Sequence, residues 1–200
     1  KDALVADFTE VVVTASDSIL LGDATDSGNT KRDTVQGILD LVPAGGLTLG
    51  TEQATTSGTG VTFSGIPSGT KLIYVMFEGV STDSTDHLSV EIGDSGGLET
   101  TGYISTTFVI QDNNDSIVGT ATDSFLSYGS IAAREWNGMF ILTLKASAAF
   151  TWICNAQGQA TTLGTIGAGI KSLSSELTQL KFSPSASANF DAGSVNIMYM

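Results

Sequence analysis

The segment 93–97 reads Gly-Asp-Ser-Gly-Gly and places Ser95 in a glycine-rich turn, where a serine hydroxyl can act as a nucleophile. Such a serine needs a general base within hydrogen-bonding distance and a buried carboxylate that orients the base. The sequence holds one histidine, His87, eight positions before Ser95. His87 and Ser95 therefore define the first catalytic hypothesis.

This pentapeptide matches the residues around the nucleophile of chymotrypsin-like serine proteases, but the position of His87 differs from that family. In the proteases the histidine lies far upstream, at the end of a separate barrel. Here the alternating segment 88–92 predicts a strand that holds His87 and Ser95 about 15 to 20 Å apart. We therefore predict no catalytic residues and no enzymatic activity, and interpret 93–97 as a turn after a strand.

Metal chemistry has few candidate ligands in this sequence. One histidine and one cysteine, Cys154, do not supply an ordinary zinc site. The segments 23–29, 81–86 and 111–115 carry carboxylate or amide oxygens suited to calcium, but none has the EF-hand spacing, and Asx turns explain them. We predict no metal and no cofactor, while calcium in the acidic loops stays an open alternative. A pair of carboxylates for glycoside hydrolysis is a second open alternative, because the distance between the two carboxyl groups identifies such a pair and the sequence does not give that distance.

Aromatic residues are the remaining candidates for a binding surface. Trp152 alternates with its neighbours as a core residue does. Trp136 follows charged residues in a predicted loop and is the best candidate for surface contact, for example with a sugar. The predicted contact residues are Trp136, Tyr128 and Tyr103.

Composition narrows the class of protein. Charged residues are only 14% of the 200 residues, and 23 glycines separate short apolar runs, as in a β-sandwich with many turns. The net charge is −13, and no Lys or Arg occurs between positions 72 and 133, so we expect no nucleic-acid partner. No apolar run is long enough for a transmembrane helix, so we expect no membrane insertion.

The N-terminal segment 1–46 differs from the rest of the chain. It has short apolar runs at 11–13 and 19–21, and Asp33 as an N-cap predicts a short helix over 34–42. A helix of about two turns is marginal alone in water, so this segment must dock, and a partner subunit is the natural candidate. The glycines at 45 and 46 mark a linker, and we predict an attachment and oligomerisation segment at 1–46 and a second domain at 47–200.

Short strands separated by turns predict the fold of 47–200. The segment 61–63 with the turn 65–69 predicts the start of a hairpin, and 72–77 is apolar throughout, which predicts a central strand covered on both faces. A hairpin is expected from 139–145 and 151–156, a weaker strand at 120–126, and further strands at 102–111 and 195–199. The segment 171–182 is ambiguous, because Leu173, Leu177 and Leu180 have helical spacing while Leu180 and Phe182 have strand spacing, and we favour one bulged strand. The predicted fold is all-β: an antiparallel jelly-roll-like β-sandwich preceded by a small N-terminal segment with a short helix.

Two segments resemble known virion proteins. The stretch 16–43, SDSILLGDATDSGNTKRDTVQGILDLVP, resembles a short module found ahead of the distal domain in bacteriophage tail fibre and related virion proteins. The stretch 61–103 and the terminal FDAGSVNIMYM, 190–200, are similar to a recurrent C-terminal β-domain of phage structural proteins. The resemblance implies a homotrimeric virion component, with the N-terminal module joining subunits and the β-domain outermost. It carries no binding residues.

We therefore expect a non-enzymatic tail fibre or fibre-tip protein, located in the virion. Its expected partners are two further copies of itself, other tail or capsid proteins, and a host surface glycan or protein that meets loops of the β-domain. A capsid decoration or head-fibre protein is the alternative. A polysaccharide-degrading tail spike is a third reading, disfavoured because no β-helix repeat is present.

Overall fold

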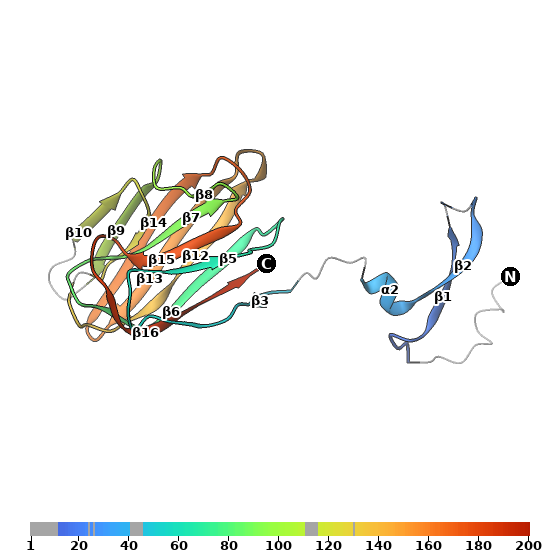
Figure 1. Ribbon diagram of the computed structural model, residues 1–200, viewed down its shortest axis with the longest axis horizontal. Coiled ribbons are helices and arrows are strands. Elements are labelled where there is room, and N and C mark those ends of the chain that lie inside the picture. The colour runs from blue at the N-terminus through green and yellow to red at the C-terminus, as the bar shows by residue number, and fades with distance from the viewer. Residues whose placement is uncertain (1–11, 24, 26, 41–45, 111–115, 130) are drawn as a thin grey trace. The chain divides into compact units, whose positions relative to one another are not determined.

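A computed structural model of the chain describes residues 12–23, 25, 27–40, 46–110, 116–129 and 131–200. The chain divides into two compact units, unit 1 at 1–46 and unit 2 at 47–200 (Figure 1). None of the helices within the described ranges has both the length and the apolar character to cross a membrane.

Unit 1 contains an antiparallel β-hairpin followed by one turn of helix. Strand β1 (Ser18–Asp23) pairs with β2 (Asn29–Thr34), and α2 (Val35–Leu39) follows directly. The helix is shorter than the predicted 34–42, and its N-cap is Thr34 rather than Asp33. The Thr34 hydroxyl accepts a 3.0 Å hydrogen bond from the Gly37 amide, while Asp33 accepts one from the Thr34 amide. Residues 41 and 42 of the predicted helix lie outside the described residues.

Unit 2 is an antiparallel β-sandwich, as the sequence predicted. In the part of the chain described, a large nine-stranded sheet has the order β10-β9-β14-β13-β12-β6-β16-β3, with β4 also on β16, and a small five-stranded sheet has the order β11-β7-β15-β5, with β8 on β7. The strands are β3 (Thr48–Leu49), β4 (Gln53–Ala54), β5 (Val61–Ser64), β6 (Leu72–Thr82), β7 (Leu88–Asp94), β8 (Gly97–Leu98), β9 (Ile104–Ile110), β10 (Ser116–Ala121), β11 (Phe125–Ser127), β12 (Trp136–Ala146), β13 (Thr151–Ala160), β14 (Leu163–Ser172), β15 (Gln179–Pro184) and β16 (Phe190–Tyr199).

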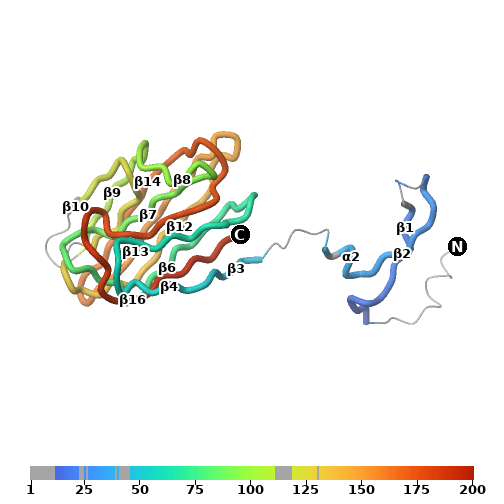
Figure 2. Tube along the Cα trace, in the orientation of Figure 1, coloured from blue at the N-terminus to red at the C-terminus, as the bar shows by residue number. Residues whose placement is uncertain are grey.

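The chain crosses repeatedly between the two sheets of the sandwich. Strands β5, β7, β11 and β15 lie in the small sheet, and β6, β9, β12 and β16 lie in the large one. Figure 2 traces the course of the chain through strands such as β6, β7 and β9. The predicted hairpin of 139–145 and 151–156 is confirmed as β12 and β13, joined by a 3-10 turn at Ser147–Ala149.

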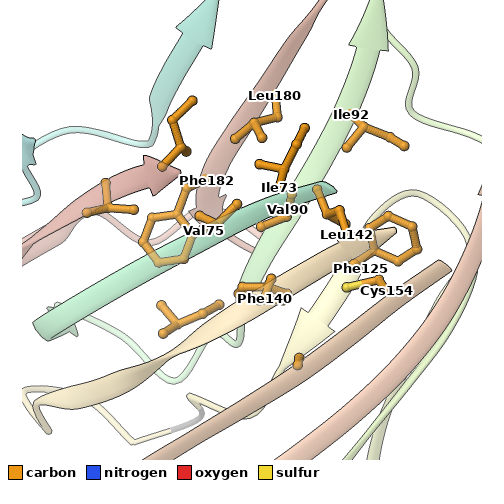
Figure 3. Packing of buried hydrophobic residues seen from close by; sticks show 14 of the residues in the cluster. Ile73, Val75, Val90, Ile92, Phe125, Phe140, Leu142, Cys154, Leu180 and Phe182 are labelled. Carbon is orange, nitrogen blue, oxygen red and sulfur yellow. The ribbon is translucent and has the colours of Figure 1, made fainter. Parts of the chain in front are cut away.

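The core lies between the two inner faces. Phe182 of the small sheet stacks on Phe77 and on Phe190, with ring centroids 5.4 Å apart in both pairs. Figure 3 shows how side chains of both sheets meet there, among them Ile73, Val75, Phe140 and Leu142 from the large sheet and Val90, Ile92 and Leu180 from the small one. Cys154 is a free cysteine at a buried strand position, and its burial raises the pKa of the thiol.

Two expectations about connections were wrong. Strands β5 and β6 do not form a hairpin, because they belong to different sheets. Their connection carries Ile66 into the core at 4% exposure, and Gly65 and Gly69 take positive φ on either side of it. The predicted weak strand at 120–126 is likewise the end of β10 and the start of β11, again in different sheets. Turns at these points therefore cross the sandwich instead of reversing within one sheet.

The prediction of one bulged strand at 171–182 was also wrong. This segment comprises the end of β14 and the start of β15, with a stretch between them that crosses from one sheet to the other. In that segment Leu173 and Leu177 are 5% and 2% exposed. The helical spacing of the leucines has another cause: Leu173 and Leu177 fill the space between the two sheets where the chain crosses from one to the other.

Candidate functional site

The Gly-Asp-Ser-Gly-Gly segment forms a tight hairpin turn between β7 and β8. Gly93 pairs with Leu98 and Asp94 with Gly97, which leaves a two-residue loop. A Cβ at Gly93 would lie 2.2 Å from the Gly97 carbonyl oxygen, and Gly97 has φ of 127°. The glycines therefore meet the requirements of the turn itself.

A polar network fixes this turn to the segment after β14. The Asp94 carboxylate accepts hydrogen bonds from the Ser174 hydroxyl at 2.6 Å and from the Gly96 amide at 2.7 Å, and these lower the pKa of Asp94. Burial opposes ionisation of Glu99, but hydrogen bonds from Lys171 and Ser174 outweigh it, so the pKa of Glu99 is also lowered. The network therefore has a structural role in closing this end of the sandwich.

The structure separates His87 from Ser95. His87 precedes β7 and Ser95 follows it, so the two lie at opposite ends of a seven-residue strand. The His87 ring packs against Tyr128, with centroids 5.4 Å apart, while Ser95 is exposed in the turn. A hydrogen bond between the two side chains is not possible in this arrangement.

The predicted aromatic contact surface needs correction. Trp136 and Tyr103 are each 1% exposed and belong to the core, so neither offers a surface for contact. Trp136 begins β12 rather than lying in a loop, and the Tyr103 hydroxyl donates to the Ile92 carbonyl and accepts from the Ile92 amide. Tyr128 is half-buried and packs edge-on against Trp136 at 5.5 Å. The alternation of Trp152 correctly indicated a core residue, since it is 2% exposed.

Two loops, 83–87 and 185–189, form an ordered cluster that we call the distal loops. The Asp83 carboxylate accepts from the backbone amide and the side-chain amide of Asn189, at 2.8 and 2.9 Å, and these bonds lower the pKa of Asp83. Asp86 accepts from the Ala188 amide at 2.8 Å, and the Ser185 amide donates to the His87 carbonyl at 2.8 Å. The carboxylates in 81–86, which the sequence offered as an alternative calcium site, thus hold two loops together.

Metal ligands do not gather elsewhere in the described part of the chain, where no group of three His, Cys, Asp or Glu side chains is placed to hold an ion. The candidate loop 111–115 lies outside the described residues, and so does part of the candidate loop 23–29.

The distal loops lie far from the point where unit 2 begins. Thr48 pairs with Tyr199, which in turn pairs with Ile73 near the start of β6, whereas the loop 83–87 follows Thr82 at its end. Ten residue steps along β6 correspond to roughly 30 Å. The chain therefore enters unit 2 at one end of the sandwich and presents the distal loops at the other.

Within the described residues of unit 1, most large apolar side chains are exposed. Exposed fractions are 89% for Val12, 65% for Val13, 43% for Ile19, 72% for Leu20 and 41% for Leu21. A two-stranded hairpin with one turn of helix does not bury enough surface to be stable alone in water. The described residues of unit 1 therefore leave an apolar surface that they do not cover themselves.

The outward side of the large sheet is a second uncovered apolar surface. One face of β6 is buried, as Ile73, Val75 and Phe77 show, but Leu72, Tyr74 and Met76 on the other face are partly exposed. The predicted second cover of this strand is thus not supplied by the described residues of unit 2. We define the outer face as the central outward residues of six adjacent strands: Leu72, Tyr74, Met76, Ile104, Thr106, Phe108, Met139, Ile141, Thr143, Ile153, Asn155, Gln157, Ile166, Ala168, Ile170, Asn196 and Met198. Glu78 and Lys145 continue β6 and β12 at the margins of this face.

No family model matches the chain, and the comparisons with curated proteins and with solved structures gave no match.

Proposed function

We propose that the chain is a non-enzymatic structural component of a bacteriophage virion, a tail fibre or fibre-tip protein. In this proposal unit 1 joins copies of the chain into a homotrimer, and unit 2 presents the distal loops to a glycan or protein on the host surface. The observation that carries the proposal is the placement of the entry to unit 2 and of the distal loops at opposite ends of the sandwich.

The state of unit 1 supports an oligomer. Leu20 and Val12 are 72% and 89% exposed, and burying such side chains stabilises by about 1.5–3 kcal/mol each. Symmetric copies of the same hairpin offer each other identical apolar surfaces, which a closed assembly needs. A trimer joined through unit 1 therefore accounts for residues that a monomer leaves in water.

The bonding of the distal loops supports a role in contact. Asp83 and Asn189 are exposed, and their hydrogen bonds fix the loops before any partner arrives. An ordered loop loses less conformational entropy on binding than a mobile one. A pre-ordered loop pair at the free end of a fibre suits attachment to a surface.

Electron cryo-microscopy of intact particles that carry the chain tests the proposal. We expect density for three copies on a tail fibre, with unit 2 outermost and the distal loops pointing away from the particle. Density on the capsid shell, with copy number set by capsid symmetry, would instead identify a decoration protein and refute the fibre assignment.

A further inference from the structure

We infer that the outer face of the large sheet is covered by a second copy of this chain. The inference rests on the proposed assembly of several copies and names a surface through which unit 2 takes part in it. It comes from unit 2 alone and is independent of the exposed hairpin of unit 1.

The composition of the outer face is that of a covered surface. The centre of the outer face is uncharged, and the charged residues Glu78 and Lys145 lie only at its margins, where the alternation of β6 and β12 continues. Apolar residues meet in register in the row Met198, Tyr74, Ile141 and in the pair Phe108 and Ile166, and the polar members of the face are uncharged Thr, Asn and Gln residues. A sheet face that meets water normally carries polar residues at these alternate positions.

The small sheet provides the contrast within the same domain. On its outward side Lys181 lies opposite both Thr62 and Glu91, and the Lys181 ammonium is 3.9 Å from a Glu91 carboxylate oxygen. That side has the polar and charged pattern of a solvated sheet. The two outward sides of one sandwich therefore differ, and only the large one has the character of an interface.

Charge favours a second copy as the occupant. The chain has a net charge of −13, so two copies repel each other wherever their carboxylates face. The outer face is a broad surface on which copies can meet without bringing like charges together. A basic partner protein finds no carboxylate at the centre of this face, since Glu78 lies at its margin.

Area and shape agree with this occupant. Six strands spaced by ~4.8 Å, with about three outward residues each, form a sheet area of roughly 600 Å² when protruding side chains are not counted. This area is comparable to the ~800 Å² that each partner buries in a stable interface. The face also has a hollow of about 330 Å³ beside Phe108, Ile166 and Ala168. Flexible methionines on the same face, Met76 and Met139, can fill such a hollow on a neighbouring copy.

Cysteine labelling of the full-length chain tests the inference. Ile166→Cys on the outer face is compared with Thr62→Cys on the outward side of the small sheet, using a maleimide reagent. Cys154, at 1% exposure, gives little background. Ile166 is 49% exposed in a single chain, so without a partner the thiol introduced at position 166 should react readily. We expect its labelling to be about tenfold slower than at position 62, and to accelerate on dilution as copies separate.

Charge insertion identifies the occupant. Ile141→Glu combined with Ile166→Cys places a carboxylate in the interface and should accelerate labelling at position 166 about tenfold, even while unit 1 keeps the copies together. The control Thr62→Glu combined with Ile166→Cys should leave labelling at position 166 slow. If the charged variant fails to fold, the dilution series of Ile166→Cys still decides.

The outcomes separate this inference from the proposed function. Fast labelling at position 166 in a chain that is nevertheless trimeric overturns the inference and leaves the fibre proposal standing. Slow labelling at position 166 that persists after dilution has separated the copies into monomers shows that the same chain covers the face, which also overturns the inference. A monomeric wild-type chain contradicts both.

Discussion

The Ser174 hydroxyl donates a 2.6 Å hydrogen bond to the Asp94 carboxylate, which joins the turn after β7 to the segment that follows β14. Ser174 also donates its amide to Glu99 at 2.7 Å. One crossing segment thus holds two ionised carboxylates, and the stability of unit 2 is linked to their ionisation.

Acid should destabilise unit 2. The folded-state pKa values of Asp94 and Glu99 are lowered from 3.8 and 4.5, so their ionised forms contribute stability that is present above those values and is lost as pH falls through the folded pKa values. Urea unfolding followed by circular dichroism should show falling stability below about pH 4.5. Asp94→Asn should cost about 1 kcal/mol at pH 7 and flatten the acid dependence, unlike the control Asp123→Asn. Equal acid profiles for both variants would contradict this role.

The turn at 93–97 should tolerate loss of its serine but not of its glycine. Ser95 is exposed, and Ser95→Ala should leave the unfolding free energy within about 0.5 kcal/mol of wild type. Gly93→Ala brings a methyl group against the Gly97 carbonyl and should destabilise by about 1–3 kcal/mol. Chemical denaturation measures both. A larger effect for Ser95→Ala than for Gly93→Ala would show that this account of the turn is wrong.

Strand β14 offers a matched pair of glycines. A Cβ at Gly169 would lie 2.6 Å from a ring carbon of Phe125, whereas the nearest atom to a Cβ at Gly164 is 3.7 Å away. We therefore expect Gly169→Ala to lower the unfolding free energy by about 1–3 kcal/mol and Gly164→Ala to be neutral or slightly stabilising. Thermal unfolding of the two variants gives the comparison, and equal midpoints would argue against close packing of β11 on β14.

The stacked aromatic core should depend on Phe182. Its ring lies between Phe77 and Phe190 and is fully buried. Phe182→Ala should cost about 3–5 kcal/mol, while Phe182→Leu, which keeps most of the volume, should cost about 1–1.5 kcal/mol. Denaturant midpoints measured on the full chain test this ratio. Similar costs for the two variants would mean that the ring is less tightly enclosed than described.

Alternation of apolar residues predicted those strands that have one buried face. It worked for 139–145, 151–156 and 195–199 because their inward residues are large and regularly spaced. Strand β14 was not predicted, since its inward positions include Gly167 and Gly169, which leave room for β11. A glycine that is needed because a neighbouring strand packs closely has no apolar side chain, so it does not contribute to the alternation that predicts a strand.

The candidate contact residues were harder to predict than the strands. Trp136 follows Arg134 and Glu135, and this charged context suggested a loop, although its ring enters the core. The distal loops depend on bonds between Asp83 and Asn189, which are 106 positions apart. Local patterns do not contain such pairings, so the loop cluster became visible only in the folded chain.

In the proposed assembly, unit 1 is held by other copies of the same chain. Sedimentation of the full-length protein at micromolar concentration measures this. We expect a species of three times the 20.6 kDa chain mass that survives mild detergent, is weakened by Leu20→Asp, and is unaffected by the control Thr30→Asp. A stable wild-type monomer of 20.6 kDa under these conditions would show that unit 1 does not join copies of the chain.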